Sequence, residues 1–129
     1  MTAKMHFFAK GLSVQKIPSE YSPCYNSKTP NDALRTRFSG GRDAQTITVI
    51  YGGETEPFGA FDVRSADVTE VDSGRKARRA QGVVIRTPEH VYTVCAAYEE
   101  RTRPYVCNGI TATGIISVFC DGERIFTKW

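Results

Sequence analysis

Two turn dipeptides in the last third of the chain constrain its fold more than any other feature. Asn108-Gly109 and Asp121-Gly122 each separate two apolar runs of β type. Both central residues of a type I′ turn need a positive φ, which Asn, Asp and Gly adopt most readily, so each dipeptide predicts a β-hairpin. The expected strands of this region are residues 81–86, 90–98, 103–107, 110–120 and 123–129. Together they predict an antiparallel meander, in which each strand pairs with the next.

A single short helix is expected ahead of this sheet. Thr29 suits the N-cap, Pro30 suits the first helical position, and an aspartate follows in the first turn. Leu34 and Phe38 lie four residues apart and would form one apolar face, and the glycine pair at 40–41 would end the helix. The sequence therefore predicts an α+β fold, with one short helix packed on a β-rich, mostly antiparallel sheet.

The other expected elements are strands and loops. Residues 6–17 suit an edge strand, and residues 18–28 read as a loop. Residues 46–51 are rich in β-branched side chains, and residues 61–64 alternate apolar with charged side chains, so both predict strands. Residues 67–80 are polar and predict an exposed loop.

Length and charge set the limits of the molecule. With 129 residues, 40% of them hydrophobic, the chain is expected to form a single domain spanning 1–129. The formal net charge is only +3, well short of a dedicated DNA-binding protein. No apolar run has the length of a signal peptide core or a membrane span, so no membrane partner is expected.

The four cysteines are Cys24, Cys95, Cys107 and Cys120. The chain has no Cys-x-x-Cys pair and only two histidines, which argues against a metal or another cofactor and favours disulfides. Disulfides would place the protein in an oxidising compartment, secreted after removal of a leader. The alternative is four free thiols in a cytosolic protein.

The meander suggests which cysteines meet. If the strand at 90–98 folds back onto the strand at 103–107, Cys95 comes opposite Val106 or Cys107, at a separation that a disulfide tolerates. This favours Cys95–Cys107 together with Cys24–Cys120. The two other connectivities stay open, because sequence alone cannot choose among them.

His90, Glu89 and Arg86 form the candidate catalytic group. A base, an acid and a cation are what RNA transesterification requires. Adjacent strand residues point to opposite faces, so Glu89 and His90 can cooperate only if the turn at 87–88 breaks the alternation. The alternative is a solvated turn histidine.

A basic run forms the candidate binding site, through Arg75, Lys76, Arg78 and Arg79. It fits a phosphate contact, a dibasic processing site or an ordinary solvated surface. Aromatic side chains interleaved with cations would favour nucleic acid by offering stacking platforms. None lies within the run, although the tyrosines at 92, 98 and 105 are on strands nearby.

The order of elements resembles that of a known family. The matching segments are Tyr21-Ser22-Pro23-Cys24 before the helix, Phe58-Gly59-Ala60-Phe61-Asp62-Val63, Gln81-Gly82-Val83-Val84-Ile85, and Tyr105-Val106-Cys107. This order is similar to that of the small secreted fungal ribonucleases and of the catalytically inactive ribonuclease-like effectors of plant-pathogenic fungi. The resemblance implies a disulfide joining Cys24 to Cys107.

The resemblance also implies that catalysis is lost. The catalytic glutamate of the family would fall on Ala60, its arginine near Gly82, and its histidine near Cys95 or Ala96. The sequence thus predicts a small secreted, effector-type binding protein, non-catalytic, that recognises a host protein or RNA through its loops. The alternatives are an active endoribonuclease using the group at His90 and a cytosolic β-rich binding module.

Overall fold

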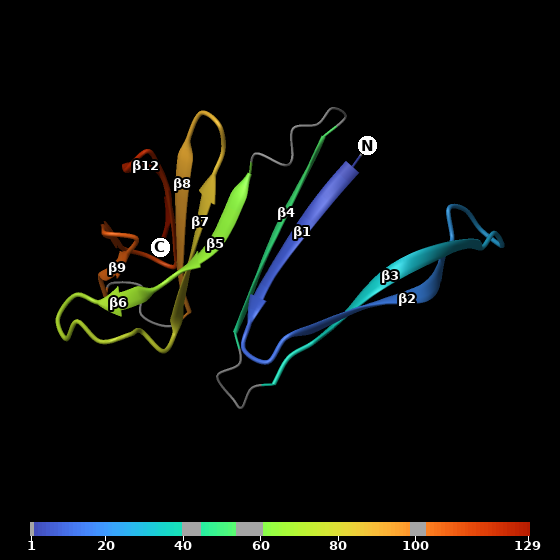
Figure 1. Ribbon diagram of the computed structural model, residues 1–129, viewed down its shortest axis with the longest axis horizontal. Coiled ribbons are helices and arrows are strands. Elements are labelled where there is room, and N and C mark those ends of the chain that lie inside the picture. The colour runs from blue at the N-terminus through green and yellow to red at the C-terminus, as the bar shows by residue number, and fades with distance from the viewer. Residues whose placement is uncertain (1, 40–44, 54–60, 99–102) are drawn as a thin grey trace. The chain divides into compact units, whose positions relative to one another are not determined.

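The protein is a set of antiparallel strands (Figure 1). The computed structural model describes residues 2–39, 45–53, 61–98 and 103–129, and within these ranges it contains twelve strands and no helix. The strands are β1 (Thr2–Ala9), β2 (Ser13–Tyr21), β3 (Thr29–Arg37), β4 (Thr46–Gly53), β5 (Asp62–Ala66), β6 (Val68–Glu70), β7 (Ala80–Arg86), β8 (Val91–Ala97), β9 (Tyr105–Cys107), β10 (Ile110–Ala112), β11 (Ile116–Cys120) and β12 (Glu123–Lys128). The described chain also holds no helix with the length and apolar character needed to cross a bilayer.

The predicted α+β class is wrong, because the segment expected to be a helix is the strand β3. It pairs antiparallel with β2 along nine residues. A short helix is stable only when its apolar face is packed against the rest of the protein. Here that face would have been Leu34 and Phe38, and in the structure these side chains are 49% and 42% exposed. Pairing with β2 instead gives the backbone hydrogen-bonding partners and brings Lys16 within 2.6 Å of Asp32. The glycine pair at 40–41 lies outside the described residues.

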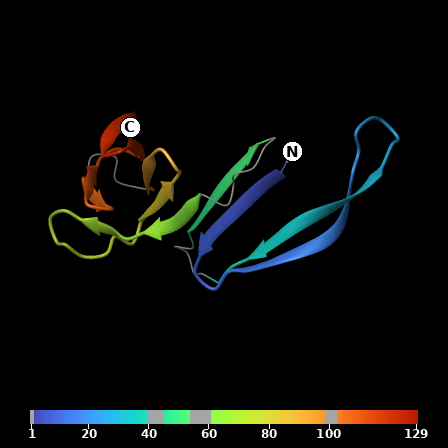
Figure 2. The ribbon, with the colours of Figure 1, turned by 45° about the horizontal axis from the view of Figure 1, so that its top comes forward.

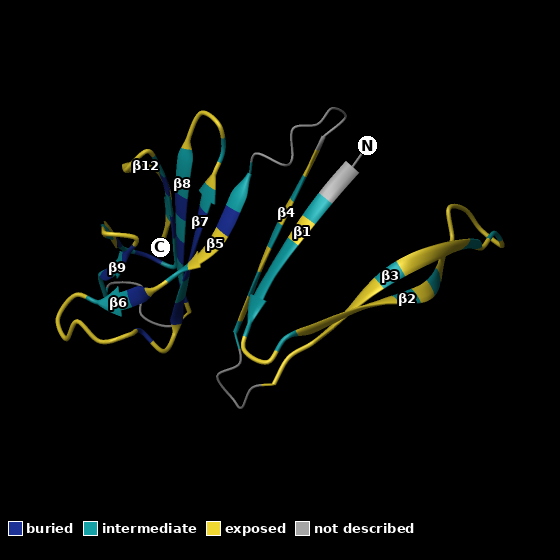
Figure 3. Cartoon of the chain, in the orientation of Figure 1, coloured by how far each residue is buried: buried dark blue, intermediate teal, exposed yellow. Residues whose placement is uncertain are grey.

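The chain divides into two compact units, one of residues 1–8 and 47–129 and one of residues 9–46. The smaller unit consists of the β2–β3 ribbon, whose residues are mostly exposed (Figure 3). The loop expected at 18–28 is shorter than predicted, because β2 continues to Tyr21. Asn26, with a φ of 57°, lies in the connection between the two strands. A single domain over 1–129 stays a prediction.

The larger unit contains a five-stranded sheet in the order β12-β11-β8-β7-β5, a three-stranded sheet in the order β10-β9-β6, and the pair β1-β4. Only Asp67 separates β5 from β6, so the chain passes directly from the larger sheet into the smaller one (Figures 1 and 2). Residues 113–115 make a second crossing, from β10 to β11, where Gly114 has a φ of 90°. The two sheets are therefore linked at two corners.

The core of this unit is built by both sheets. Its buried cluster is Val68, Ala77, Ala80, Cys95, Ala97, Tyr105, Cys107, Ala112 and Phe119. Gly82 is needed at its position in β7, because a Cβ there would lie 2.4 Å from Cys107 Sγ. The missing side chain lets the β9 sulfur approach the backbone of the larger sheet.

Both hairpins predicted from the turn dipeptides are confirmed. Asn108 and Asp121 have φ values of 51° each, the glycines after them are also at positive φ, and the flanking strands pair antiparallel as β9–β10 and β11–β12. The predicted order of the meander is wrong, because β8 pairs with β7 and β11 and not with β9. The expected strand 110–120 is two strands in two different sheets.

Candidate functional site

The basic run lies in a loop that folds back onto β6. The N–H of Glu70 donates to the carbonyl of Arg75 at 2.9 Å, and the N–H of Ala77 donates to the carbonyl of Val68 at 2.8 Å. Ala77 is 7% exposed and anchors the loop in the core. The prediction of an exposed loop at 67–80 is thus wrong for β6, for Ala77 and for Ala80, the buried first residue of β7. The cations at 75, 76, 78 and 79 are exposed.

The four cations predicted as a binding site line one pocket of about 380 Å³. Arg103 also lines it, although no pattern in the sequence groups this residue with the basic run. The connection is the antiparallel pairing of β6 with β9, in which Glu70 lies opposite Tyr105. The described residues that line the pocket are Glu70, Arg75, Lys76, Ala77, Arg78, Arg79, Arg103 and Tyr105.

The described residues of the pocket lining are mostly cationic. Five of them are arginine or lysine, and one, Glu70, is acidic. Glu70 Oε2 lies 3.6 Å from Arg103 Nη2 and accepts a hydrogen bond from Ser73 Oγ at 2.7 Å. Lys76 Nζ lies 2.7 Å from Asp67 Oδ1, and this contact holds the pKa of Asp67 below its ordinary value. Such a lining favours an anionic ligand.

An exposed aromatic ring is attached to the same loop. The N–H of Tyr98 donates to the carbonyl of Arg79 at 2.9 Å, which ties the end of β8 to the basic run. Tyr98 is 50% exposed, and its hydroxyl donates to Gln81 Oε1 at 3.4 Å. By contrast, Tyr105 is 5% exposed and belongs to the core.

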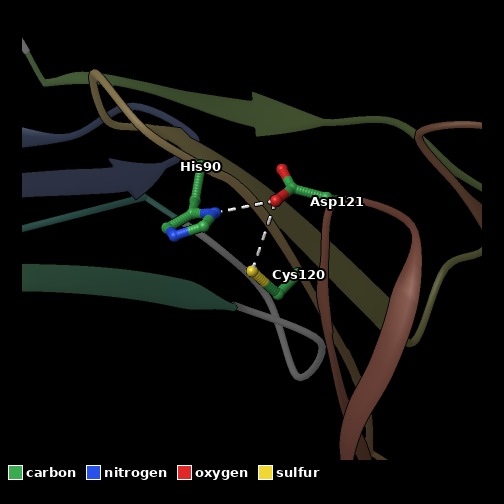
Figure 4. A group of neighbouring side chains, drawn as sticks. All are labelled: His90, Cys120 and Asp121. Carbon is green, nitrogen blue, oxygen red and sulfur yellow. Dashed lines mark hydrogen bonds and ion pairs between the residues drawn. The ribbon is translucent and has the colours of Figure 1, made fainter.

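The predicted catalytic histidine, His90, contacts Asp121 and not the expected Glu89 or Arg86 among the described contacts. His90 Nδ1 lies 2.8 Å from Asp121 Oδ2, and Cys120 Sγ lies 3.8 Å from the same oxygen (Figure 4). Arg86 lines a separate pocket of about 340 Å³ whose lining does not include His90. No described contact joins His90 to Glu89 or Arg86, so catalysis by these three residues stays a prediction.

Asp121 was not predicted as the partner of His90, because the expected meander did not pair the strand after His90 with the strand before Asp121. In the β8–β11 pair, Cys120 lies opposite Tyr92, so the turn before β8 and the turn after β11 meet at one end of the sheet. The N–H of Val91 donates to Asp121 Oδ1 at 2.8 Å. This bond and the His90 contact hold the pKa of Asp121 below its ordinary value of 3.8.

The four cysteines are all free thiols in the structure. The expected register of Cys95 against Cys107 is wrong, since Cys95 lies opposite Gly82 and Ser117. The two thiols nevertheless meet across the core and hydrogen-bond each other, and this bond together with burial raises the pKa of Cys95. The disulfide pairings and the secretion inferred from them stay predictions.

Comparisons of the chain with models of protein families, with curated proteins and with solved structures found no match. The resemblance to secreted ribonucleases therefore stays a prediction.

Proposed function

We propose that the protein is a non-catalytic binding protein that holds single-stranded RNA through the basic pocket. The observation that carries this proposal is the convergence of five cations, from the loop at 75–79 and from Arg103, around one pocket of about 380 Å³. A cavity of this size accommodates a phosphate with part of its nucleotide. Arginine and lysine are the side chains that most often contact phosphate oxygens.

The cations at the pocket support an anionic ligand. Five described residues of the lining are arginine or lysine and one is glutamate. Lys76 and Arg103 also contact carboxylates, at 2.7 and 3.6 Å. An anion such as a phosphate group would be attracted to these cationic side chains.

The exposed aromatic ring next to the basic run favours RNA over an isolated phosphate. Tyr98 is half-exposed and is tied by its backbone to Arg79, so a base next to a bound phosphate could stack on its ring. Base stacking on an aromatic side chain contributes about 1–3 kcal/mol and tolerates any sequence. Binding is therefore expected to be weakly sequence-selective and salt-dependent.

The test is fluorescence anisotropy with a labelled single-stranded RNA at several salt concentrations. Replacing Arg75, Lys76, Arg78 and Arg79 with alanine should weaken binding at low salt by at least about 100-fold, since several RNA phosphates would no longer be neutralised. The dependence of log K on log salt should also flatten, by about 0.7 for each of these phosphates. Tyr98→Ala should weaken binding by about 10-fold without changing the slope.

A matched variant separates the pocket from the overall charge. Replacing Lys10, Lys28, Arg35 and Arg37 with alanine removes the same four charges from the other unit, taking the net charge from +3 to −1 in both variants. This control should bind RNA almost as well as the wild type. Equal losses in the two variants, or no RNA binding by the wild type, would contradict the proposal. Cleavage of the RNA that is lost in His90→Ala would contradict its non-catalytic part.

A further inference from the structure

His90, Cys120 and Asp121 bring three different donor atoms together at one end of the larger sheet (Figure 4). A ring nitrogen, a thiol sulfur and a carboxylate oxygen all lie within 4.8 Å of one another. Two of these separations are 2.8 Å, between His90 Nδ1 and Asp121 Oδ2, and 3.8 Å, between Cys120 Sγ and Asp121 Oδ2. Three donor atoms this close together are the arrangement that a small cation needs.

The backbone fixes the carboxylate. Asp121 Oδ1 accepts the N–H of Val91 at 2.8 Å, and the N–H of Asp121 donates to the carbonyl of Val91 at 2.8 Å. The first of these bonds occupies one carboxylate oxygen and leaves Oδ2 directed at His90 and Cys120. A hydrogen bond to the second oxygen of a ligating carboxylate is a common feature of metal sites, because it orients the ligand.

The histidine is held from the other side by its own turn. Thr87 Oγ1 accepts the N–H of His90 at 3.0 Å, and the N–H of Thr87 donates to the carbonyl of His90 at 2.9 Å. The ring of Tyr92 lies edge-on to the imidazole, with the ring centroids 6.0 Å apart. Both turns are thus closed independently of the side-chain contact between His90 and Asp121, so they stay in place when that contact is replaced.

The donor set matches zinc. Imidazole nitrogen, thiolate sulfur and carboxylate oxygen are its three usual protein ligands, at about 2.0–2.3 Å from the ion, and tetrahedral coordination separates donors by about 3.3–3.7 Å. His90 Nδ1 and Asp121 Oδ2 would have to move apart by about 0.5 Å from their hydrogen-bonded separation of 2.8 Å. The distance of 3.8 Å between Cys120 Sγ and Asp121 Oδ2 lies about 0.1 Å beyond this range.

We propose that His90 Nδ1, Cys120 Sγ and Asp121 Oδ2 bind a Zn²⁺ ion, with water in the fourth position. On binding, the Cys120 thiol gives its proton to solvent, and the imidazole is neutral with its hydrogen on Nε2, so that the Nδ1 lone pair reaches the ion. No electron is transferred. His90 and Asp121 are 46% and 51% exposed at their side chains, so ion and water can enter directly from solvent.

The experiment is a titration of the full chain with Co²⁺, which reports its ligands by absorption, in a buffer with a reductant that is not a thiol. The wild type should bind one ion with a thiolate-to-cobalt band in the near ultraviolet and tetrahedral bands in the visible. Zn²⁺ should then remove both sets of bands. The absence of a thiolate band at saturating Co²⁺ would overturn the proposal.

Three variants locate the site. Cys120→Ser should lose the thiolate band and bind Zn²⁺ at least about 10-fold more weakly. Asp121→Asn keeps an acceptor for the Val91 N–H and tolerates the positive φ, so it should fold and still bind Zn²⁺ at least about 10-fold more weakly. Cys24→Ser removes an exposed thiol from the other unit and should bind like the wild type. An unchanged thiolate band in Cys120→Ser, or its loss in Cys24→Ser, would contradict the assignment.

Discussion

Gly82→Ala is the substitution whose effect follows most directly from the packing of the two sheets. The added methyl carbon would lie 2.4 Å from Cys107 Sγ, whereas ordinary contacts begin at 3.4 Å. The sulfur would have to retreat by about 1 Å inside a close-packed core, and overpacking of this kind costs about 1–3 kcal/mol. Because Val68 Cγ2 and Ala66 Cβ are also close, at 3.1 and 3.2 Å, we expect a loss near the upper end, about 3 kcal/mol.

The assay is urea unfolding followed by the fluorescence of Trp129, the single tryptophan, which belongs to the same unit as Gly82. The midpoint should fall while the dependence on urea stays the same, because the fold is unchanged. A free energy of unfolding within about 0.5 kcal/mol of the wild type would refute the steric argument.

A double-mutant cycle shows whether the sulfur is the cause. Cys107→Ala alone should cost about 1–2 kcal/mol by removing a buried atom, but it also frees the space that the methyl of Gly82→Ala needs. The loss of stability in the double variant should therefore be smaller, by at least about 1 kcal/mol, than the sum of the losses in the two single variants. Gly122→Ala is the control, since it strains a φ of 88° in the β11–β12 turn with nothing within 4 Å, and its loss should simply add to that of Cys107→Ala. If the losses from Gly82→Ala and Cys107→Ala simply add, a contact other than the Cys107 sulfur limits the space for the new methyl group.

Three further outcomes follow from burial and charge. Phe119→Ala should cost about 3–5 kcal/mol in the same urea assay, whereas Phe126→Ala, at a side chain 51% exposed, should cost less than about 1 kcal/mol; similar losses would contradict the assignment of the core. Cys95 and Cys107, 3% and 0% exposed, should resist alkylation in the native protein and react once it is unfolded, as peptide mass spectrometry can measure; early labelling or a disulfide between them would contradict the free, buried pair. Because folding lowers the pKa of Asp121 from 3.8, its carboxylate stabilises the fold at pH values above 3.8. The wild type should therefore be more stable than Asp121→Asn at about pH 7, and this difference should vanish as the pH falls through the lowered pKa. Urea unfolding at a series of pH values from about 7 to about 2 measures it.

The turns could be predicted from sequence because their determinants are local. Asn108 and Asp121 precede glycine between apolar runs, and few conformations suit such a dipeptide. The signals at Thr29 and Pro30 were ambiguous, because threonine favours strands and proline is tolerated near the start of an edge strand as well as at the start of a helix. What decided between helix and strand was the partner β2, whose pairing along nine residues no local signal reveals.

The order of the strands could not be predicted for the same reason. Neighbours in sequence are the default partners, but the chain leaves the larger sheet after β8, forms β9 and β10 in the smaller sheet, and returns as β11. The basic run could be grouped from the sequence because its members are nearly consecutive. Arg103, Cys120 and Asp121 could not be, because they join the candidate sites only through the pairs β6–β9 and β8–β11.

The two candidate sites depend on different strand pairs and so can be tested independently. The basic pocket needs β9 beside β6, which brings Arg103 to the loop at 75–79. The zinc site needs β11 beside β8, which brings Asp121 to His90. Of the buried cluster, the basic pocket includes Ala77 and Tyr105, and the three zinc ligands lie outside it. Charge-removing substitutions at exposed positions should therefore leave the core intact. Loss of RNA binding in the basic variant together with normal metal binding, and the reverse in Asp121→Asn, would therefore show two separate sites on one scaffold.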